Sequence, residues 1–531
     1  MPISTVAPVI SFRHLRISVL SHRFVTTTSQ THDFGLLEWS ERSSERRCVA
    51  VPTTRAISLL FGVVVVLAVV AGACDSDSAP RRERPHPSRP VPSGSDISPR
   101  WAETMLGPSN EDEFDGVAAS PDGSVYVTGK FESTVTLGGI SVESAGAADI
   151  PFARFGAQGQ PVWTKRFGGP GEDNLFDVDA NADGPVATGA FSGTVAFGSA
   201  TLTSSGPLDC VIVALAPDGE TRWARAFGGP GRDGCNEVTV GINGAVTTSI
   251  DTQGDWTPVG EQHLPRARQS ETVLLRLTAD GSPTWMRPVG GAGAQRGKSL
   301  AVAPDGSVSF GGDTVGSLTI AGRTVEAPAS GGLRDAWLSR WAPDGTLQWV
   351  DTWGGPGDDL AKGVVDDGEN VSYVGPFTGT LTVAGTTLDA GERADTLVAQ
   401  RSPTGAVRWA TSVSASAALD GSEAVGASDG GILFGSQRVP GMQFGSANGQ
   451  AIPLDAANGG TAWLAQYGQG GVPRFARTIA GTANGRVGEI ARVGSRVYVD
   501  VTLRGSANTM NGSPITVAGK DASVWALDLR G

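Results

Sequence analysis

From residue 101 to the C-terminus, short apolar stretches alternate with breaks rich in Gly and Asp, and no stretch has helical spacing. Residues 163–167 alternate large apolar and polar side chains, which predicts a strand. Residues 175–179, 185–191 and 209–216 predict three more strands. The Asp-Gly pair before residue 185 supplies the positive φ that a hairpin turn needs. This segment therefore predicts four strands and no helix.

The four-strand pattern recurs along the chain with a nearly constant period. A tryptophan marks it every 60 to 64 residues, at Trp101, Trp163, Trp223, Trp285, Trp349 and Trp409. Phe475 takes the place of a seventh anchor. A fixed period of this size indicates a repeat architecture with one supersecondary unit per repeat. Four strands per unit and seven anchors predict an all-β, seven-bladed β-propeller.

The two ends of the repeat region predict how the ring closes. Residues 100–106 form a lone tryptophan strand, and residues 521–529 form a lone strand that opens with aspartate. Pairing them completes the last blade and removes two exposed strand edges, which otherwise favour aggregation. We expect the tryptophan strand to be the outer one, with its ring between neighbouring blades.

Two acidic positions recur with the repeat. One aspartate opens the last strand of five repeats, at Asp149, Asp209, Asp335, Asp395 and Asp521. Another ends the turns Gly-Gly-Pro-Gly-Glu-Asp173 and Gly-Gly-Pro-Gly-Asp-Asp359. These turns are similar to a Gly-Gly-x-Gly-x-Asp calcium motif, although that motif recurs every nine residues in its own fold. The alternative is a tight turn whose Asp accepts backbone N–H bonds. We predict no cofactor, and calcium is the alternative.

The repeat text resembles a known family. The strings Trp223-Ala-Arg-Ala-Phe-Gly-Gly-Pro-Gly-Arg-Asp233 and Asp122-Gly-Ser-Val-Tyr-Val-Thr-Gly-Lys-Phe131 look like the bacterial SBBP-type β-propeller repeat. The match covers about residues 100–531 and weakens in the third and sixth repeats. The resemblance implies a propeller in a secreted or lipid-anchored protein. It carries over no catalytic residue, because the family has no common catalytic site.

The first hundred residues contain export signals rather than a domain. Residues 57–73 are an unbroken run of apolar and small residues before Cys74, and the Ala-Gly-Ala-Cys ending resembles a bacterial lipobox. We therefore predict a lipoprotein signal peptide over 55–74 and lipid attachment at Cys74. An uncleaved membrane anchor and simple secretion are the alternatives. Residues 1–54 are a doubtful leader or a cytoplasmic tail, and 75–99 are a Pro/Arg/Ser linker that should be disordered.

Composition excludes several functional classes. The formal net charge of −13 argues against nucleic acid as a partner. Only His263 follows the linker, so a His-rich metal site is excluded and a Ser-His-Asp site would need that one residue. We predict no catalytic residue and no metal site. Cys210 and Cys235 are the only thiols of the propeller. Cys210 opens the last strand of the second repeat and Cys235 follows the next Gly-Gly-Pro-Gly turn, so both should lie near the same rim and are a disulfide candidate. Two unpaired thiols are the alternative.

The leading functional hypothesis is a non-enzymatic lipoprotein of the cell envelope. Its propeller would lie outside the cytoplasm, as a monomer held to the membrane only by lipid, and would bind a protein or carbohydrate partner. Binding should map to residues 253–270 and 438–458, which break the repeat. One alternative is an enzyme, because Ala-Pro-Asp-Gly-x-x-x-Trp at 216–223 and 342–349 resembles the docking repeat of quinoprotein dehydrogenases. A polysaccharide lyase or hydrolase and a structural module of an envelope assembly are the others.

Overall fold

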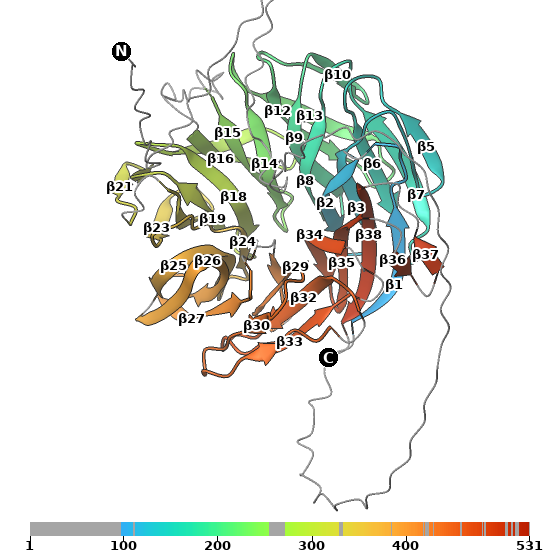
Figure 1. Cartoon of the computed structure of the whole chain (residues 1–531). Coiled ribbons are helices and arrows are strands. Elements are labelled where there is room, and N and C mark those ends of the chain that lie inside the picture. Colours follow the sequence, from blue (N-terminus) through green and yellow to red (C-terminus); the bar gives the residue numbers. More distant parts are fainter. Residues whose placement is uncertain are drawn as a thin grey trace, which may run out of the picture. The chain divides into compact units, whose positions relative to one another are not determined.

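A computed structural model describes residues 97–109, 112–253, 271–328, 333–383, 385–417, 419, 424–427, 429–456, 459–479, 482, 485–504, 508–510, 513–515 and 520–529. By contact density the chain divides into two units, Met1–Pro87 and Ser88–Gly531, and the second contains all of these residues. Their regular structure is β-strand (Figure 1). Across these ranges no helix has the length and hydropathy needed to cross a membrane.

The strands form seven antiparallel blades around one axis (Figure 1). Strands are given from the inner to the outer one. Blade 1 consists of β2 (Glu113–Ala119), β3 (Val125–Lys130), β6 (Ile150–Phe155) and β7 (Pro161–Phe167), and blade 2 of β8 (Asn174–Asn181), β9 (Gly184–Phe191), β12 (Asp209–Leu215) and β13 (Thr221–Phe227). Blade 3 consists of β14 (Gly234–Val240), β15 (Val246–Thr252), β16 (Glu271–Leu277) and β17 (Pro283–Gly291). Blade 4 consists of β18 (Gln295–Val302), β19 (Val308–Thr314), β22 (Asp335–Trp341) and β23 (Leu347–Trp353), and blade 5 of β24 (Gly363–Asp366), β25 (Val371–Val383), β26 (Thr386–Arg401) and β27 (Val407–Ser414). Blade 6 consists of β28 (Ala424–Gly426), β29 (Ile432–Gln437), β32 (Ala462–Tyr467) and β33 (Pro473–Thr478). Blade 7 is β34 (Gly485–Val493), β35 (Arg496–Arg504), β38 (Lys520–Leu529) and β1 (Ile97–Thr104). The predicted seven-bladed propeller is confirmed.

Blade 7 closes the ring with strands from opposite ends of this region. β1 pairs antiparallel with β38, with Ala102 opposite Trp525, and β38 pairs on its other edge with β35. Each inner strand contacts the inner strand of the next blade, and β34 contacts β2. The predicted closure, with the tryptophan strand outermost, is therefore confirmed.

Most blades carry a small extra hairpin between their second and third strands. These are β4 (Thr134–Leu137) with β5 (Ile140–Glu143), β10 (Thr194–Phe197) with β11 (Ala200–Thr203), β20 (Leu318–Ile320) with β21 (Arg323–Val325), β30 (Gln443–Phe444) with β31 (Ile452–Pro453), and β36 (Asn508–Met510) with β37 (Ser513–Ile515). The hairpins of blades 4 and 6 also pair with the outer strand of the preceding blade. In blade 5 the excursion is continuous with β25 and β26. Asp395 therefore lies inside β26, and the prediction that it opens a strand is wrong.

The repeated tryptophans dock each blade onto the next. Each indole N–H donates to a carbonyl in the turn between the third and fourth strands of the following blade. The pairs are Trp101–Ala157 at 3.4 Å, Trp163–Pro217 at 3.0 Å, Trp223–Ala279 at 2.9 Å, Trp285–Pro343 at 3.0 Å, Trp349–Pro403 at 2.9 Å and Trp409–Gln469 at 2.5 Å. The same turn ends in a glycine against the ring. At Gly281, φ is +79° and an added Cβ would lie 2.7 Å from Trp223.

The one anchor that is not tryptophan stands where no such turn exists. Phe475 lies on β33, the outer strand of blade 6, and its neighbour is blade 7. The third and fourth strands of blade 7 are β38 and β1, so no hairpin turn joins them. An indole N–H there would have no turn carbonyl to meet, whereas the apolar ring of Phe475 still packs against buried side chains of blade 7.

The hydrophobic core lies between the blades rather than at one centre. One cluster combines Ile212 and Ala214 of blade 2 with Val238, Ile250 and Leu275 of blade 3. Because strand side chains alternate between the two faces of a sheet, each blade contributes to two such layers. A rigid ring follows, with its strand ends and inner edges left to carry function.

Candidate functional site

The antiparallel order of each blade creates two different rims. First-to-second and third-to-fourth strand turns lie on one side, which we call the docking rim because it receives the tryptophans. Second-to-third strand excursions and the Gly-Gly-Pro-Gly turns between blades lie on the other side, which we call the excursion rim. Each inner strand begins at the excursion rim.

The recurrent aspartates are structural groups of the excursion rim. Asp173 accepts the N–H of Gly169 at 2.7 Å and of Ser192 at 3.0 Å. Asp359 accepts the N–H of Gly355 at 2.7 Å and of Thr378 at 3.1 Å. Each carboxylate thus uses both oxygens to join the turn before an inner strand to the end of the second strand of the same blade. These contacts match the alternative in which the Asp of a tight turn accepts backbone N–H bonds. Within the described ranges no group of three or more His, Cys, Asp or Glu residues is arranged to hold a metal ion.

Burial changes the protonation of these aspartates. Asp359 is fully buried, and desolvation, with a smaller contribution from the charge of Asp335, raises its pKa from 3.8 to about 6. Burial similarly raises the pKa of Asp395 to about 6 and, without a value, the pKa of Asp173, Asp209 and Asp233. In each case folding favours the protonated form of the carboxyl relative to the unfolded chain.

We expect the ring to be more stable near pH 5 than near pH 7.5. A carboxyl whose pKa is raised by folding contributes stability below its unfolded pKa, and this stability is lost as the pH rises through the folded value. For Asp359 the window runs from 3.8 to about 6, and the contribution is at most about 3 kcal/mol. Melting curves between about pH 4.5 and pH 8 measure it. Asp359→Asn should flatten the dependence, and a melting temperature that rises across this range would contradict the assignment.

A second group of polar residues lies at the inner edge of the ring. Five inner strands carry a β-bulge near their start, between Phe114 and Gly116, Leu175 and Asp177, Cys235 and Val238, Gly297 and Ser299, and Val487 and Ile490. A bulge leaves its extra residue unpaired and re-aims the side chain. The bulged positions differ between blades: they carry Asp115, Phe176, Asn236 with Glu237, Lys298, and Gly488 with Glu489. Lys362 holds the same position before β24, three residues after Asp359 as Lys298 is three after Gln295.

Charged side chains gather at the inner edge of blades 3 to 5. Asp313 on β19 accepts the Arg296 Nε–H at 3.2 Å and an Arg296 Nη2–H at 3.1 Å through one oxygen, Oδ2. Asp251 on β15 accepts the Asn236 side-chain N–H at 2.8 Å. Lys298 lies in the field of both carboxylates and of Lys362. We call Asn236, Asp251, Arg296, Lys298, Asp313 and Lys362 the axial cluster.

The carboxylates and the cations of the axial cluster differ in exposure. Asp251 and Asp313 are 4% and 1% exposed, whereas the Arg296 side chain is 22% exposed and both lysines are partly exposed. Burial lowers the pKa of the Lys298 amine and raises the pKa of both carboxyls. The arrangement places two buried carboxylates among three cationic residues that are partly exposed, and such cations suit a negatively charged ligand.

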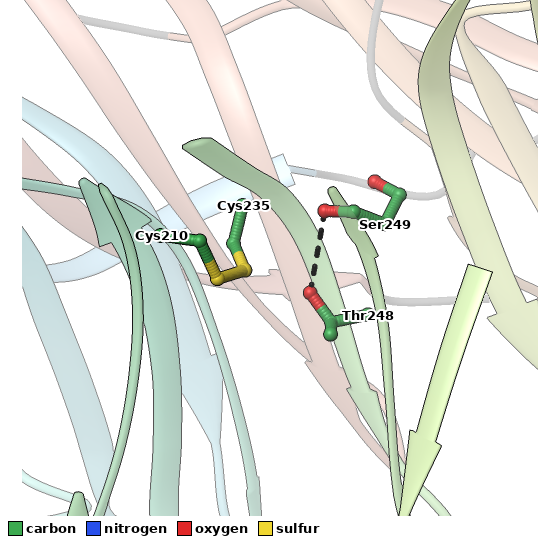
Figure 2. The surroundings of a disulfide bond; sticks show 4 residues. All are labelled: Cys210, Cys235, Thr248 and Ser249. Atoms are coloured by element: carbon green, nitrogen blue, oxygen red, sulfur yellow. Dashed lines mark hydrogen bonds between the residues drawn. A yellow bond between two sulfur atoms is a disulfide. The ribbon is translucent and has the colours of Figure 1, made fainter. Parts of the chain in front are cut away.

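A disulfide fixes the strand on which the cluster begins. Cys210 on β12 is bonded to Cys235 on β14, with their Cα atoms 4.9 Å apart, so blade 2 is covalently joined to blade 3 (Figure 2). These are the two cysteines that the sequence proposes as a pair. Figure 2 also shows Thr248 and Ser249 of β15 beside the bond. Asn236, which holds Asp251, follows Cys235 directly, so the crosslink restrains the acidic layer of the axial cluster.

The residues proposed from the sequence have different outcomes. Cys74, His263 and residues 254–270 lie outside the described residues. Residues 438–456 form the excursion of blade 6 on the excursion rim, where Met442 and Phe444 are buried, and residues 457–458 lie outside the described residues; binding at this segment stays a prediction. Sequence reasoning missed the axial cluster. A usable signal was present, because two of the five lysines of the chain occupy the same position in neighbouring repeats.

Comparison with known proteins adds one distant relative. The regulatory protein FlaEY of Caulobacter vibrioides is 26% identical over 439 residues, which cover 75% of this chain and 44% of that protein. The chain thus spans less than half of this relative. No family model matches the chain.

Solved structures of similar shape carry different functions. The WD40 β-propeller domain of Doa1 is 8% identical, with a TM-score of 0.38, over 82% of this chain and 97% of that domain. The polysaccharide lyase Uly1 is 9% identical, with a TM-score of 0.40, over 80% of this chain and 91% of that one. At such scores these likenesses carry no argument beyond the fold that the seven sheets already define.

Proposed function

We propose that this protein is a non-enzymatic, lipid-anchored binding protein of the cell envelope, with an SBBP-type propeller that recognises a protein or carbohydrate partner. The axial cluster is the observation that carries the proposal. It occurs only in part of an otherwise repetitive ring, and its residues differ from those at the same positions in other blades. Positions that depart from a repeat are where a specific surface is built on a repeated scaffold.

Other charged groups of the ring support binding rather than catalysis. The rim aspartates are occupied by backbone N–H groups of the turns. Arg340 is held by Asp366 at 2.8 Å, and Arg401 lies over the rings of Trp349 and Trp353. These contacts join neighbouring elements of the ring, whereas the cations of the axial cluster are confined to blades 4 and 5. The word regulatory in the name of the distant relative is in keeping with a binding function.

Two observations support the envelope location. The disulfide between Cys210 and Cys235 is typical of proteins that fold in oxidising compartments. The apolar run before Cys74 has the form of a lipoprotein signal. The proposed order is therefore a lipid at Cys74, a polar linker and then the ring.

The experiment separates binding from turnover with the full-length protein in detergent. The probes are polysaccharide and solubilised protein fractions from the envelope of the cells that make it. We expect saturable retention of one fraction, without new reducing ends or unsaturated sugar products. Turnover that a single carboxylate substitution abolishes would favour the lyase or hydrolase alternative, and an ordered quinone would favour the oxidoreductase.

The anchor is examined in the same cells by labelling with a radioactive fatty acid. Cys74→Ser should abolish the label and leave an unprocessed precursor, whereas Cys210→Ser should keep the label because that residue belongs to the ring. Normal labelling of Cys74→Ser would place the anchor elsewhere and leave the binding result unaffected.

A further inference from the structure

We propose that the axial cluster is an anion-binding site in which Lys298, flanked by Arg296 and Lys362, binds a carboxylate or phosphate group of the ligand. This inference rests on the binding function proposed above, and it names the chemical class of the ligand. Two candidate sources carry such groups in an envelope: uronic acid sugars and phosphorylated molecules.

The position of Lys298 favours a role outside the fold. It is the bulged residue of β18, between Gly297 and Ser299, whose backbones keep their pairing with β19. Blades 1 and 2 carry Asp115 and Phe176 at this position without disturbing the ring. A position that accepts an acid, an aromatic ring and an amine does not require one kind of side chain, so the fold alone does not account for the lysine.

The choice of lysine is itself informative. Basic residues number 41, and five of them are lysine, at Lys130, Lys165, Lys298, Lys362 and Lys520. Lys298 on β18 and Lys362, directly before β24, hold equivalent positions in adjacent blades, and the two inner strands contact each other. Like charges in neighbouring blades attract the same counter-ion, so an anionic group that lies near both lysines gains Coulomb energy from each.

A buried carboxylate holds one cation of the cluster in place, and a second carboxylate lies in the field of Lys298. Asp313 fixes the Arg296 guanidinium through two N–H groups, and its other oxygen, Oδ1, has no hydrogen-bond partner among the described residues. Asp251 is itself oriented by Asn236 and lies in the field of Lys298. A cation that is already positioned, as Arg296 is, loses little freedom on binding, which strengthens the interaction with an anion.

The pKa of the Lys298 amine should couple ligand binding to the uptake of a proton. Burial lowers the pKa of its amine, Arg296 and Lys362 lower it further, and Asp313 and Asp251 act in the opposite sense. A bound anion favours the charged amine and raises this pKa. Binding should therefore take up protons, and affinity should fall as the pH rises through the pKa of the free site.

The test measures binding to the full-length protein by titration calorimetry at about 0.15 M salt. The probes are inorganic phosphate, tri-galacturonic acid and, as the neutral counterpart, maltotriose. The variants are Lys298→Gln and Lys362→Gln. The matched control is Lys165→Gln, which removes the same charge from an outer strand, where Lys165 pairs with Glu220 at 3.0 Å.

We expect one of the two anionic probes to bind, and the preferred probe identifies the source of the group. Lys298→Gln should weaken that binding about tenfold or more, and Lys165→Gln should leave it unchanged. Maltotriose should not bind. Titration in buffers of different ionisation enthalpy should report proton uptake by the native protein and less by Lys298→Gln.

The outcomes separate this inference from the proposed function. Absence of binding by both anions, or equal effects of Lys298→Gln and Lys165→Gln, would overturn the anion site. If an envelope partner is still retained equally by Lys298→Gln and the native protein, the binding function stands and the ligand contacts another surface. Lys362→Gln keeps the test decisive if Lys298→Gln fails to reach the native melting temperature.

Discussion

Removal of residues 520–531 should unfold the whole ring rather than fray one blade. β38 is the third strand of blade 7 and, within the described ranges, the only strand that pairs with β1, so its loss leaves β1 and β35 with open edges. The layers between blades 6, 7 and 1 lose Trp525, Val524 and Leu527, all fully buried. The expected loss is comparable to the stability of a whole domain, about 5–15 kcal/mol.

Thermal unfolding followed by circular dichroism, together with limited proteolysis, measures this effect. The control ends at Leu529 and lacks only the last two residues, so it retains β38. We expect the control to melt as the full chain does, and the truncation to lack a cooperative transition. A truncation that melts at the native temperature would refute ring closure by β1 and β38.

Trp223→Ala should destabilise the ring by about 3–5 kcal/mol. The indole is 8% exposed, packs against Gly281 and donates to the carbonyl of Ala279 in the next blade. Its removal leaves both a cavity and an unpaired carbonyl between blades 2 and 3. Trp223→Phe keeps most of the apolar contact and should lose less, about 1–2 kcal/mol. Urea unfolding monitored by circular dichroism gives these values.

Glycine variants provide the matched control for the docking contact. Gly281→Ala meets the Trp223 ring at 2.7 Å with φ at +79°, whereas Gly385 has nearly the same φ, +78°, and no atom within 4 Å of an added Cβ. Gly385→Ala therefore reports the cost of the backbone conformation alone, and the difference between the two variants reports the clash. Equal losses for Gly281→Ala and Gly385→Ala, or a negligible loss for Trp223→Ala, would show that docking contributes little.

The repeat made the architecture predictable to an unusual degree. Period-two alternation, Asp-Gly turns and the tryptophan spacing are local signals, and together they define seven four-stranded blades and the closing pair. The excursions were less predictable. Whether a short hairpin stands alone, as β10 and β11 do, or extends into the main strands, as at Asp395, depends on tertiary contacts at the rim.

The sequence by itself determined the strands, their number and the ring, because strand alternation and turn chemistry act over a few residues and the repeat multiplies them. Only the tertiary structure decided which charges meet. Asn236, Lys298 and Lys362 are separated by more than sixty residues along the chain, and they converge because three bulged or equivalent positions stand on adjacent inner strands. Asp251 and Asp313 support them from the second strands, which no local pattern reveals. Their proximity follows from blade stacking around one axis, a property of the closed ring rather than of any single repeat.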